Sequence, residues 1–258
     1  MRKVLLAMGI YLFAYSTPVT GDFVWSALRP GLEMEQGQFQ DHGKSVRFVL
    51  LRCDPARNVV RVVDTFHEIG KGNALAAFSL REVMMKTGSL LAVNAGTSYS
   101  YSLPIPGGLL LTHGKIITPV NRQAHNSGFL CVASDRLVIT DLSGLRPENC
   151  AYAVQKGPLI FRETAASVSD FNHRTVIAVD EQQRLLILIT EDAASLPGIA
   201  AFLYASSPEL NVQSALNMEG GATSGLLIAP ELKAQPSEVG NVDGLVASAI
   251  AVYSRKAQ

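Results

Sequence analysis

The stretch RTVIAVDEQQRLLILIT, from Arg174 to Thr190, shows most directly how this chain folds. Two runs rich in Val, Ile and Leu flank the polar residues Asp180 to Gln183. Branched and large apolar side chains at this density favour extended backbone, and a short polar cluster between two such runs is typical of a turn. The stretch therefore predicts a β-hairpin.

Other segments repeat this pattern on both sides of the hairpin. Strands are predicted in 45–53 and 59–63 around a turn at Asp54-Pro55-Ala56, in 90–93, in 108–111 and 115–118, in 128–133 and 137–140, in 151–161 with a break at Gly157-Pro158, and in 244–255. The polar segment from Trp25 to Gly43 is expected to be irregular.

Two segments predict helices. Ser79 is a suitable N-cap for a helix that runs to Lys86, and Glu82 three residues later completes a capping box. Leu196 to Ser206 is the second helical segment. Because strands outnumber helices and do not alternate with them, we expect an α+β fold: a single domain over residues 22–258, with a large mixed, mostly antiparallel sheet and two or three helices.

The N-terminus has the pattern of a secretory signal. Arg2 and Lys3 precede a short apolar run, Val4 to Tyr15, and small, turn-prone residues follow. We expect a signal peptide over residues 1–21, a mature start between residues 17 and 24, and a periplasmic or secreted protein. The apolar run is shorter than the ~20 residues that span a bilayer, so no stable membrane span is expected after removal of the signal. An uncleaved anchor or a buried first element are the alternatives.

The charge and the cysteines restrict the class further. The 258 residues carry 22 basic and 22 acidic side chains without a Lys/Arg block, so nucleic-acid binding is not expected.

Of Cys53, Cys131 and Cys150, the last two are nearest in sequence and are the favoured disulfide pair in an oxidising compartment. Three buried free thiols are the alternative.

Several predicted strands end in polar turns that contain glycine or precede another strand. These turns are Asn94-Ala95-Gly96-Thr97, Gln155-Lys156-Gly157-Pro158, Asn172-His173-Arg174-Thr175 and Asn217-Met218-Glu219-Gly220-Gly221. Polar groups at the ends of strands are able to converge on a pocket while the apolar runs stay in the core. Each turn taken alone is equally explained as an ordinary chain reversal.

The order of these motifs resembles the phosphodiester glycosidase family, which includes the enzyme that uncovers mannose 6-phosphate in the Golgi and many bacterial exported proteins. The matching text is LLAVNAGTSYS, PGGLLLTHGKI, YAVQKGPLIF, HRTVIAV and ALNMEGGATSGLL, preceded by the helix SLREVMMKTG. The likeness covers the chain from Val46 to Tyr253. One position departs from the family, which usually has Asp where this chain has Glu219.

The resemblance implies hydrolysis of a sugar-1-phosphodiester at the glycosidic side, with a carbohydrate or phosphosugar as the partner. Glu219 would activate water or stabilise an oxocarbenium ion, and Arg174 would hold the diester anion with its planar fork. Asp192 is the second candidate carboxylate, and its alternative role is that of a helix-start residue favoured by the helix dipole. The expected substrate-binding residues are Asn94, Gly96, Gln155, Gly157, Thr175, Asn217, Gly220, Gly221 and Ser224.

Within that set, the N–H groups of Gly220, Gly221 and Ala222 are expected to form an anion nest. No cofactor or dedicated metal-ligand motif is expected, although carboxylate and amide oxygens would suit Ca²⁺ or Mg²⁺. The longer side chain of Glu219 moves the carboxylate away from the position it has with Asp, and a displacement of ~1 Å in an active site lowers a rate by ~100-fold. A second hypothesis is therefore a non-catalytic periplasmic binder of phosphorylated glycans. A structural envelope protein whose glycines only make turns is the third.

Overall fold

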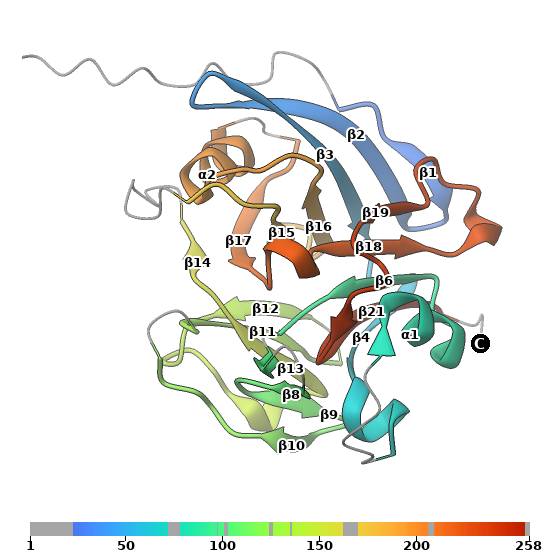
Figure 1. The fold of residues 1–258 in the computed structure, drawn as a ribbon, viewed down its shortest axis with the longest axis vertical. Helices are drawn as coiled ribbons and strands as arrows, with labels where there is room; N and C mark the ends of the chain where they lie inside the picture. The colour runs from blue at the N-terminus through green and yellow to red at the C-terminus, as the bar shows by residue number, and fades with distance from the viewer. Residues whose placement is uncertain are drawn as a thin grey trace, which may run out of the picture.

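Antiparallel β-sheets form most of the structure (Figure 1), a computed structural model that describes residues 23–71, 78–96, 98–100, 103–123, 126–134, 136–161, 170–205 and 209–255. The largest sheet has seven strands, in the order β1 (Ser26–Arg29), β2 (Leu32–Asp41), β3 (Lys44–Cys53), β16 (Leu185–Thr190), β15 (Thr175–Asp180), β17 (Val212–Asn217) and β14 (Leu159–Ile160). The prediction of an α+β fold with mostly antiparallel pairing is confirmed.

Two further sheets have five strands each. The first has the order β10 (Lys115–Thr118), β9 (Leu110–Thr112), β13 (Tyr152–Lys156), β11 (Gly128–Val132) and β12 (Leu137–Thr140). The second has the order β19 (Glu238–Gly240), β18 (Gly225–Ile228), β6 (Leu91–Asn94), β21 (Ser248–Ser254) and β4 (Asn58–Asp64). Two short pairs complete the described strands: β20 (Leu245–Val246) with β5 (Phe78–Ser79), and β7 (Ser98–Ser100) with β8 (Leu103–Pro106).

The predicted hairpins β15–β16, β9–β10 and β11–β12 are present with antiparallel registers. The strands on either side of Asp54-Pro55-Ala56 are also present, but they join different sheets: β3 pairs with β2 and β16, whereas β4 pairs with β21. The expectation that 25–43 is irregular is wrong, because β1 and β2 lie there. The strand β2 has many polar residues because several of its side chains face solvent, and these conceal its alternation.

The alternation of side chains along the strands explains why the three sheets pack together. In β16, Leu185, Ile187 and Ile189 face a central cluster that all three sheets share, while Leu186 and Leu188 face the opposite side. A strand whose two faces are both covered has no polar position, which is why LLILIT reads as one apolar run.

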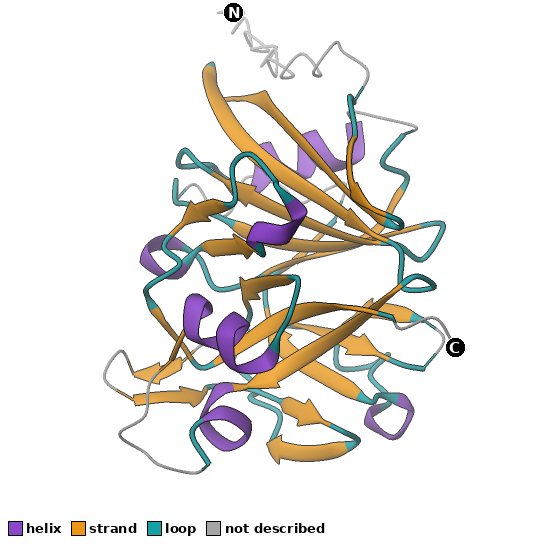
Figure 2. Ribbon diagram, turned by 90° about the vertical axis from the view of Figure 1, so that its right-hand side faces the viewer, coloured by secondary structure: helices purple, strands orange, loops and turns teal. Residues whose placement is uncertain are grey.

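Helices cover the outer faces of two sheets (Figure 2). Helix α2 (Leu196–Ala205) packs on the seven-stranded sheet, and α1 (Leu80–Thr87) packs on the sheet that contains β6. The capping box of α1 is formed as predicted, and Gly88 ends the helix with a positive φ of 65°. In the part of the chain that the structure describes, the other helical segments are a short π-helix (Thr65–Ile69) and three 3₁₀ turns (Pro147–Asn149, Gly221–Thr223, Pro230–Leu232). No helix in the described ranges is long and apolar enough to cross a membrane.

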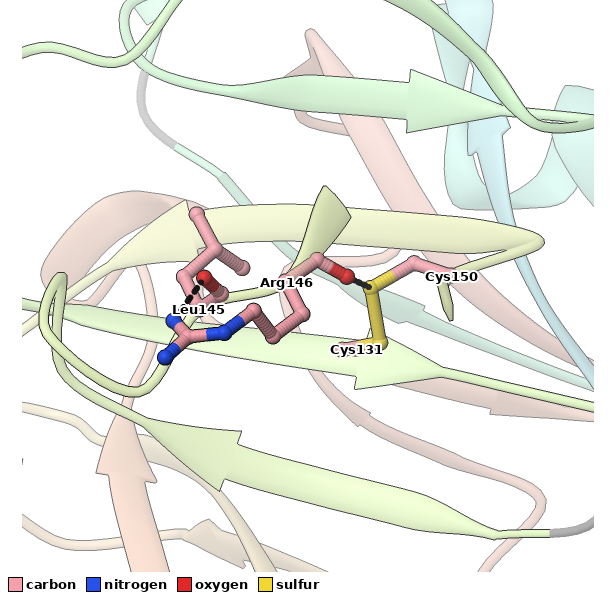
Figure 3. Close-up of a disulfide and its surroundings, with 4 residues drawn as sticks. All are labelled: Cys131, Leu145, Arg146 and Cys150. Atoms are coloured by element: carbon pink, nitrogen blue, oxygen red, sulfur yellow. Dashed lines mark hydrogen bonds between the residues drawn. A yellow bond between two sulfur atoms is a disulfide. The ribbon is translucent and has the colours of Figure 1, made fainter. Parts of the chain in front are cut away.

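A disulfide joins Cys131 to Cys150 (Figure 3), which confirms the favoured pairing and rules out three free thiols. It fastens β11 to the loop that follows β12. Within that loop the Arg146 guanidinium donates to the carbonyl of Leu145 at 2.8 Å. Cys53 is buried among apolar side chains, and burial raises the pKa of its thiol to about 12. Cys53 is therefore protonated at neutral pH and packs as a small apolar residue.

Thiol counting checks this assignment. We expect the mature protein to react with iodoacetamide at no cysteine when native, at one cysteine when unfolded without reductant, and at three after reduction. Labelling of three cysteines in the unfolded, unreduced protein would contradict the disulfide.

Loss of the disulfide should also destabilise the fold. Closing a loop of 19 residues stabilises a protein by about 3 kcal/mol through the entropy of the unfolded chain. We therefore expect the double variant Cys131→Ser/Cys150→Ser to lose about that much in urea unfolding. Reductant should lower the stability of the wild type and leave that of the double variant unchanged.

Candidate active site

All four predicted strand-end turns meet in space, because Lys156 and Gly157 of the second turn contact the Glu219 turn. The turn after β17 lies between the end of β6 and the start of β15. The N–H of Met218 donates to the carbonyl of Thr175 at 2.8 Å, and the N–H of Glu219 donates to the carbonyl of Ala95 at 3.1 Å. This arrangement brings the Asn94, Arg174 and Glu219 motifs together, as the sequence analysis expected.

Asn94 holds these segments to one another. Its side chain is buried, with 1% of the residue exposed. The Oδ1 atom accepts hydrogen bonds from the hydroxyl of Thr175 at 2.7 Å and from the N–H of Gly225 at 3.0 Å, and Nδ2 donates to the carbonyl of Glu219. Asn94 and Thr175 were both expected to bind substrate, but these contacts give them a role in positioning the Glu219 turn.

The two glycines after Glu219 are required by the geometry of the turn. A Cβ atom at Gly220 would lie 2.9 Å from the carbonyl oxygen of His173, and Gly221 has a left-handed φ of 69°. The N–H of Gly221 donates to that same carbonyl at 2.9 Å. The predicted anion nest is thus wrong for Gly221, whose donor is already used inside the protein.

An ion pair joins Glu219 to a lysine that the sequence analysis did not include among the site residues. The Nζ atom of Lys156 lies 3.0 Å from Oε2 of Glu219, and the exposed fractions of the two side chains are 12% and 24%. Lys156 is the last residue of β13, so it reaches the turn from a different sheet. The motif QKGP contains the lysine, but only the tertiary structure shows where it points.

Gln155, the neighbour of Lys156, faces away from this turn. Its Oε1 atom accepts from the N–H groups of Leu109 and Asn121 at 2.9 Å, and Nε2 donates to the carbonyls of Asn121 and Asn126. Adjacent residues in a strand point to opposite faces, so Gln155 and Lys156 lie on opposite sides of the sheet. The prediction that Gln155 and Glu219 share one site is wrong for this reason.

Arg174 lies beneath the glycine turn and is largely buried, with 5% of the residue exposed. Its Nε atom donates to the carbonyl of Ala194 at 3.1 Å, and Nη2 donates to the carbonyl and carboxylate of Asp170 at 2.7 and 2.9 Å. Its Nη1 atom would be 3.9 Å from a Cβ atom at Gly220. Arg174 therefore lies beside Gly220, but most of its donors are used within the protein.

Asp192 belongs to a different interaction. Its carboxylate accepts hydrogen bonds from the backbone N–H, Nε and Nη2 of Arg47 at 3.0, 2.9 and 2.9 Å. The side-chain hydrogen bonds from Arg47 lower the pKa of Asp192 to about 2. A carboxylate with so low a pKa is a poor proton donor at neutral pH, so the structure favours an ion-pairing role over that of a second catalytic carboxylate.

The other expected site residues surround the same turn. Asn217 donates from Nδ2 to the carbonyl of Gly157 at 3.1 Å, and the N–H of Gly96 donates to the hydroxyl of Ser248 at 3.0 Å. Among the described residues, Asn217 Oδ1 and Ser224 Oγ are buried polar atoms without a hydrogen-bond partner. Buried polar atoms are normally paired, so two unpaired atoms so close together in the sequence are unusual.

The described residues hold no cluster of three or more His, Cys, Asp or Glu side chains arranged for a metal ion.

The sequence pattern of the phosphodiester glycosidases matches residues 87–253, a region that contains the Glu219 turn and all the strands around it. This chain belongs to the phosphodiester glycosidase family. No curated protein matches the sequence.

Solved structures share the fold of this phosphodiester glycosidase family member. The zebrafish N-acetylglucosamine-1-phosphodiester alpha-N-acetylglucosaminidase catalytic domain, auto-inhibited by its pro-peptide, has a TM-score of 0.64 and 14% identity, with 88% of this chain and 85% of that chain covered. A hypothetical protein from Synechocystis has a TM-score of 0.61 and 13% identity, covering 92% of this chain and 64% of that one. An exported protein from Burkholderia pseudomallei has a TM-score of 0.54 and 12% identity, covering 81% and 74%.

Removal of the Asn94 amide tests its positioning role. Asn94→Ala leaves the buried N–H of Gly225 and the carbonyl of Glu219 without partners, and each unpaired group costs about 1–3 kcal/mol. We expect a loss of about 3 kcal/mol in urea unfolding. The exposed Gln213→Ala should change stability by less than about 0.5 kcal/mol, and equal effects of the two variants would contradict the role of Asn94.

The Asp192–Arg47 pair predicts a pH dependence of stability. Because the pKa of Asp192 is lowered in the folded state, the pair stabilises the protein above pH 4, and this contribution is lost as the pH falls toward 2. Asp192→Asn should therefore be less stable than the wild type at pH 7, and the difference should disappear near pH 2. Urea unfolding between pH 2 and 7 measures this, with the exposed Glu231→Gln as the control that stays close to wild type throughout.

Proposed function

We propose that this protein is an exported hydrolase that removes a sugar from a sugar-1-phosphodiester by cleaving the glycosidic bond. Membership of the phosphodiester glycosidase family supports the reaction class. The observation that carries the proposal is the Lys156–Glu219 ion pair at a glycine turn, where one carboxylate and one ammonium group meet beside buried polar atoms that lack partners.

The proposed reaction needs one carboxylate. A water oxygen forms a bond to C1 of the sugar, and its proton passes to the carboxylate of Glu219. The bond between C1 and the phosphate oxygen breaks, and its electron pair leaves with the phosphate. The leaving phosphomonoester is already an anion and requires little help from a general acid. This is consistent with the placement of Asp192 in a separate ion pair.

The neighbouring groups have complementary roles in this proposal. The ammonium group of Lys156 stabilises negative charge on the phosphate. A turn without a charged side chain would not do this. Asn217 Oδ1 accepts from a sugar hydroxyl, and Ser224 Oγ donates to or accepts from another. Asn94 fixes the Glu219 turn through the carbonyl of Glu219 and the N–H of Gly225, so that the carboxylate does not have to reorganise during the reaction.

An exported location accompanies this function. The N-terminal signal pattern of residues 1–21, which lies outside the described residues, predicts export. The Cys131–Cys150 disulfide is typical of an oxidising compartment such as the periplasm or the extracellular space.

A non-catalytic binder of phosphorylated glycans is the second candidate function. The observation that favours it is again the ion pair, because Lys156 neutralises the charge of Glu219, and Glu219 is one methylene longer than the aspartate usual in the family. Such a site would retain a phosphosugar through Lys156 without activating water.

The experiment compares Glu219→Gln with the exposed Glu231→Gln. The mature protein is incubated with methyl and aryl phosphodiesters of N-acetylglucosamine and glucose linked at C1, and release of free sugar is measured. We expect turnover by the wild type and by Glu231→Gln, and a loss of about 10²- to 10⁴-fold in Glu219→Gln, because the variant removes the proton acceptor without changing its size.

Other outcomes distinguish the candidates. Saturable binding of these diesters without turnover, weakened in Lys156→Met, would support the binder. Turnover that is unchanged in Glu219→Gln would contradict the catalytic role of this carboxylate. Neither binding nor turnover across the set would contradict both functions.

A further inference from the structure

A cavity lies on the face of the five-stranded sheet with β13 that is opposite to the Glu219 turn. It has a volume of about 590 Å³, which is within the range of ~300–1,000 Å³ typical of small-molecule sites. Its floor includes Phe129 and Gln155, one wall is formed by residues 120–123 together with Asn126 and Ser127, and the other is the loop from Asp141 to Ser143. Because Gln155 and Lys156 point to opposite faces of β13, this cavity is separate from the candidate active site.

The first wall of the cavity is held by Gln155. Three of the four hydrogen bonds of its side chain fix the backbone of Asn121 and Asn126 against the sheet, and the fourth is accepted from the N–H of Leu109. A Cβ atom at Gly108 would lie 2.9 Å from Oε1 of Gln155, so this network is tightly packed. The side chain of Gln155 both accepts and donates hydrogen bonds in this network, which explains the need for an amide at a position that does not face Glu219.

The second wall is held by the disulfide. Cys150 ties the end of the loop to β11 (Figure 3), and Asp141 begins the loop. One oxygen of Asp141 accepts hydrogen bonds from the N–H and hydroxyl of Ser143 and from the N–H of Gly144, at 2.9, 2.6 and 3.0 Å. Both walls are thus preorganised, which lowers the entropy that a ligand loses on binding.

The polar groups of the cavity indicate the kind of ligand. Asn126 is 4% exposed, and its Oδ1 atom has no hydrogen-bond partner among the described residues. Arg122 and Asp141 add one cation and one anion, so their formal charges cancel. Val120 and Leu142 supply apolar surface, and 41% of Leu142 is exposed.

A sugar hydroxyl both donates and accepts hydrogen bonds, so it satisfies an amide oxygen, a carboxylate and a guanidinium equally well. The C–H groups of a sugar ring match the apolar wall. A phosphate group offers mainly acceptors, and it would face the Asn126 oxygen and the Asp141 carboxylate unfavourably.

We propose that this cavity binds a neutral sugar unit of a glycan, at a site distinct from the candidate active site. The inference does not depend on the proposed hydrolase activity, because it rests on a different face of the sheet and on different residues. A protein with both sites would hold a glycan chain at the cavity independently of any phosphodiester at Glu219.

Calorimetric titration tests the proposal with the mature protein and four neutral probes: maltotriose, cellotriose, xylotriose and triacetylchitotriose. We expect at least one probe to bind, and Arg122→Ala and Asn126→Ala to weaken that binding by about tenfold or more, since each removes a polar contact. Arg57→Ala and Asn211→Ala are the matched controls outside the cavity. Because Arg122 is exposed, its variant should fold normally, which urea unfolding verifies.

Two further measurements separate this site from the candidate active site. Glu219→Gln should leave binding of the neutral probe unchanged, and glucose 1-phosphate should not compete with that probe at the cavity. Absence of binding by all four probes at about 10 mM would overturn the proposal. So would binding that both cavity variants leave unchanged.

Discussion

A buried amide connects the parts of this structure that matter for its chemistry. Asn94 ends a strand of one sheet, and its side chain bonds to Thr175 at the start of a strand in another sheet. It also bonds to the two ends of the turn that carries Glu219, through the carbonyl of Glu219 and the N–H of Gly225. Because Asn94 and Thr175 are buried, the position of the carboxylate depends on this amide.

The two proposed sites lie on opposite faces of the sheet at the end of β13. Lys156 turns toward Glu219 and the shared core, whereas Gln155 turns toward the cavity on the outer face of the same sheet. Side chains of adjacent residues in a strand point to opposite faces, so neighbouring residues of β13 belong to different sites. The disulfide acts on the second face, where it holds the loop that begins at Asp141.

The charged groups near the turn differ in what they are free to do. Asp192 and Arg47 satisfy one another at the surface, and Arg174 is committed mainly to Ala194 and Asp170. Lys156 and Glu219 are paired as well, but they lie beside polar atoms that have no partner in the described structure. Because of these unpaired atoms, both proposed functions use the Lys156–Glu219 pair.

Much of the fold could be predicted from the sequence, because it follows from local physics. The β15–β16 hairpin, the capping box of Ser79 and Glu82, and the β9–β10 hairpin all depend on neighbouring residues, and all are present. The order of the motifs also indicated the family and the Glu219 turn. The pairing of β3 with β16 and of β4 with β21 depends on contacts distant in sequence, which no local pattern encodes. The contact of Lys156 with Glu219 could not be predicted for the same reason, because it depends on how the sheets pack. The packing also decides that Gln155 faces away from Glu219 and that Asp192 pairs with Arg47.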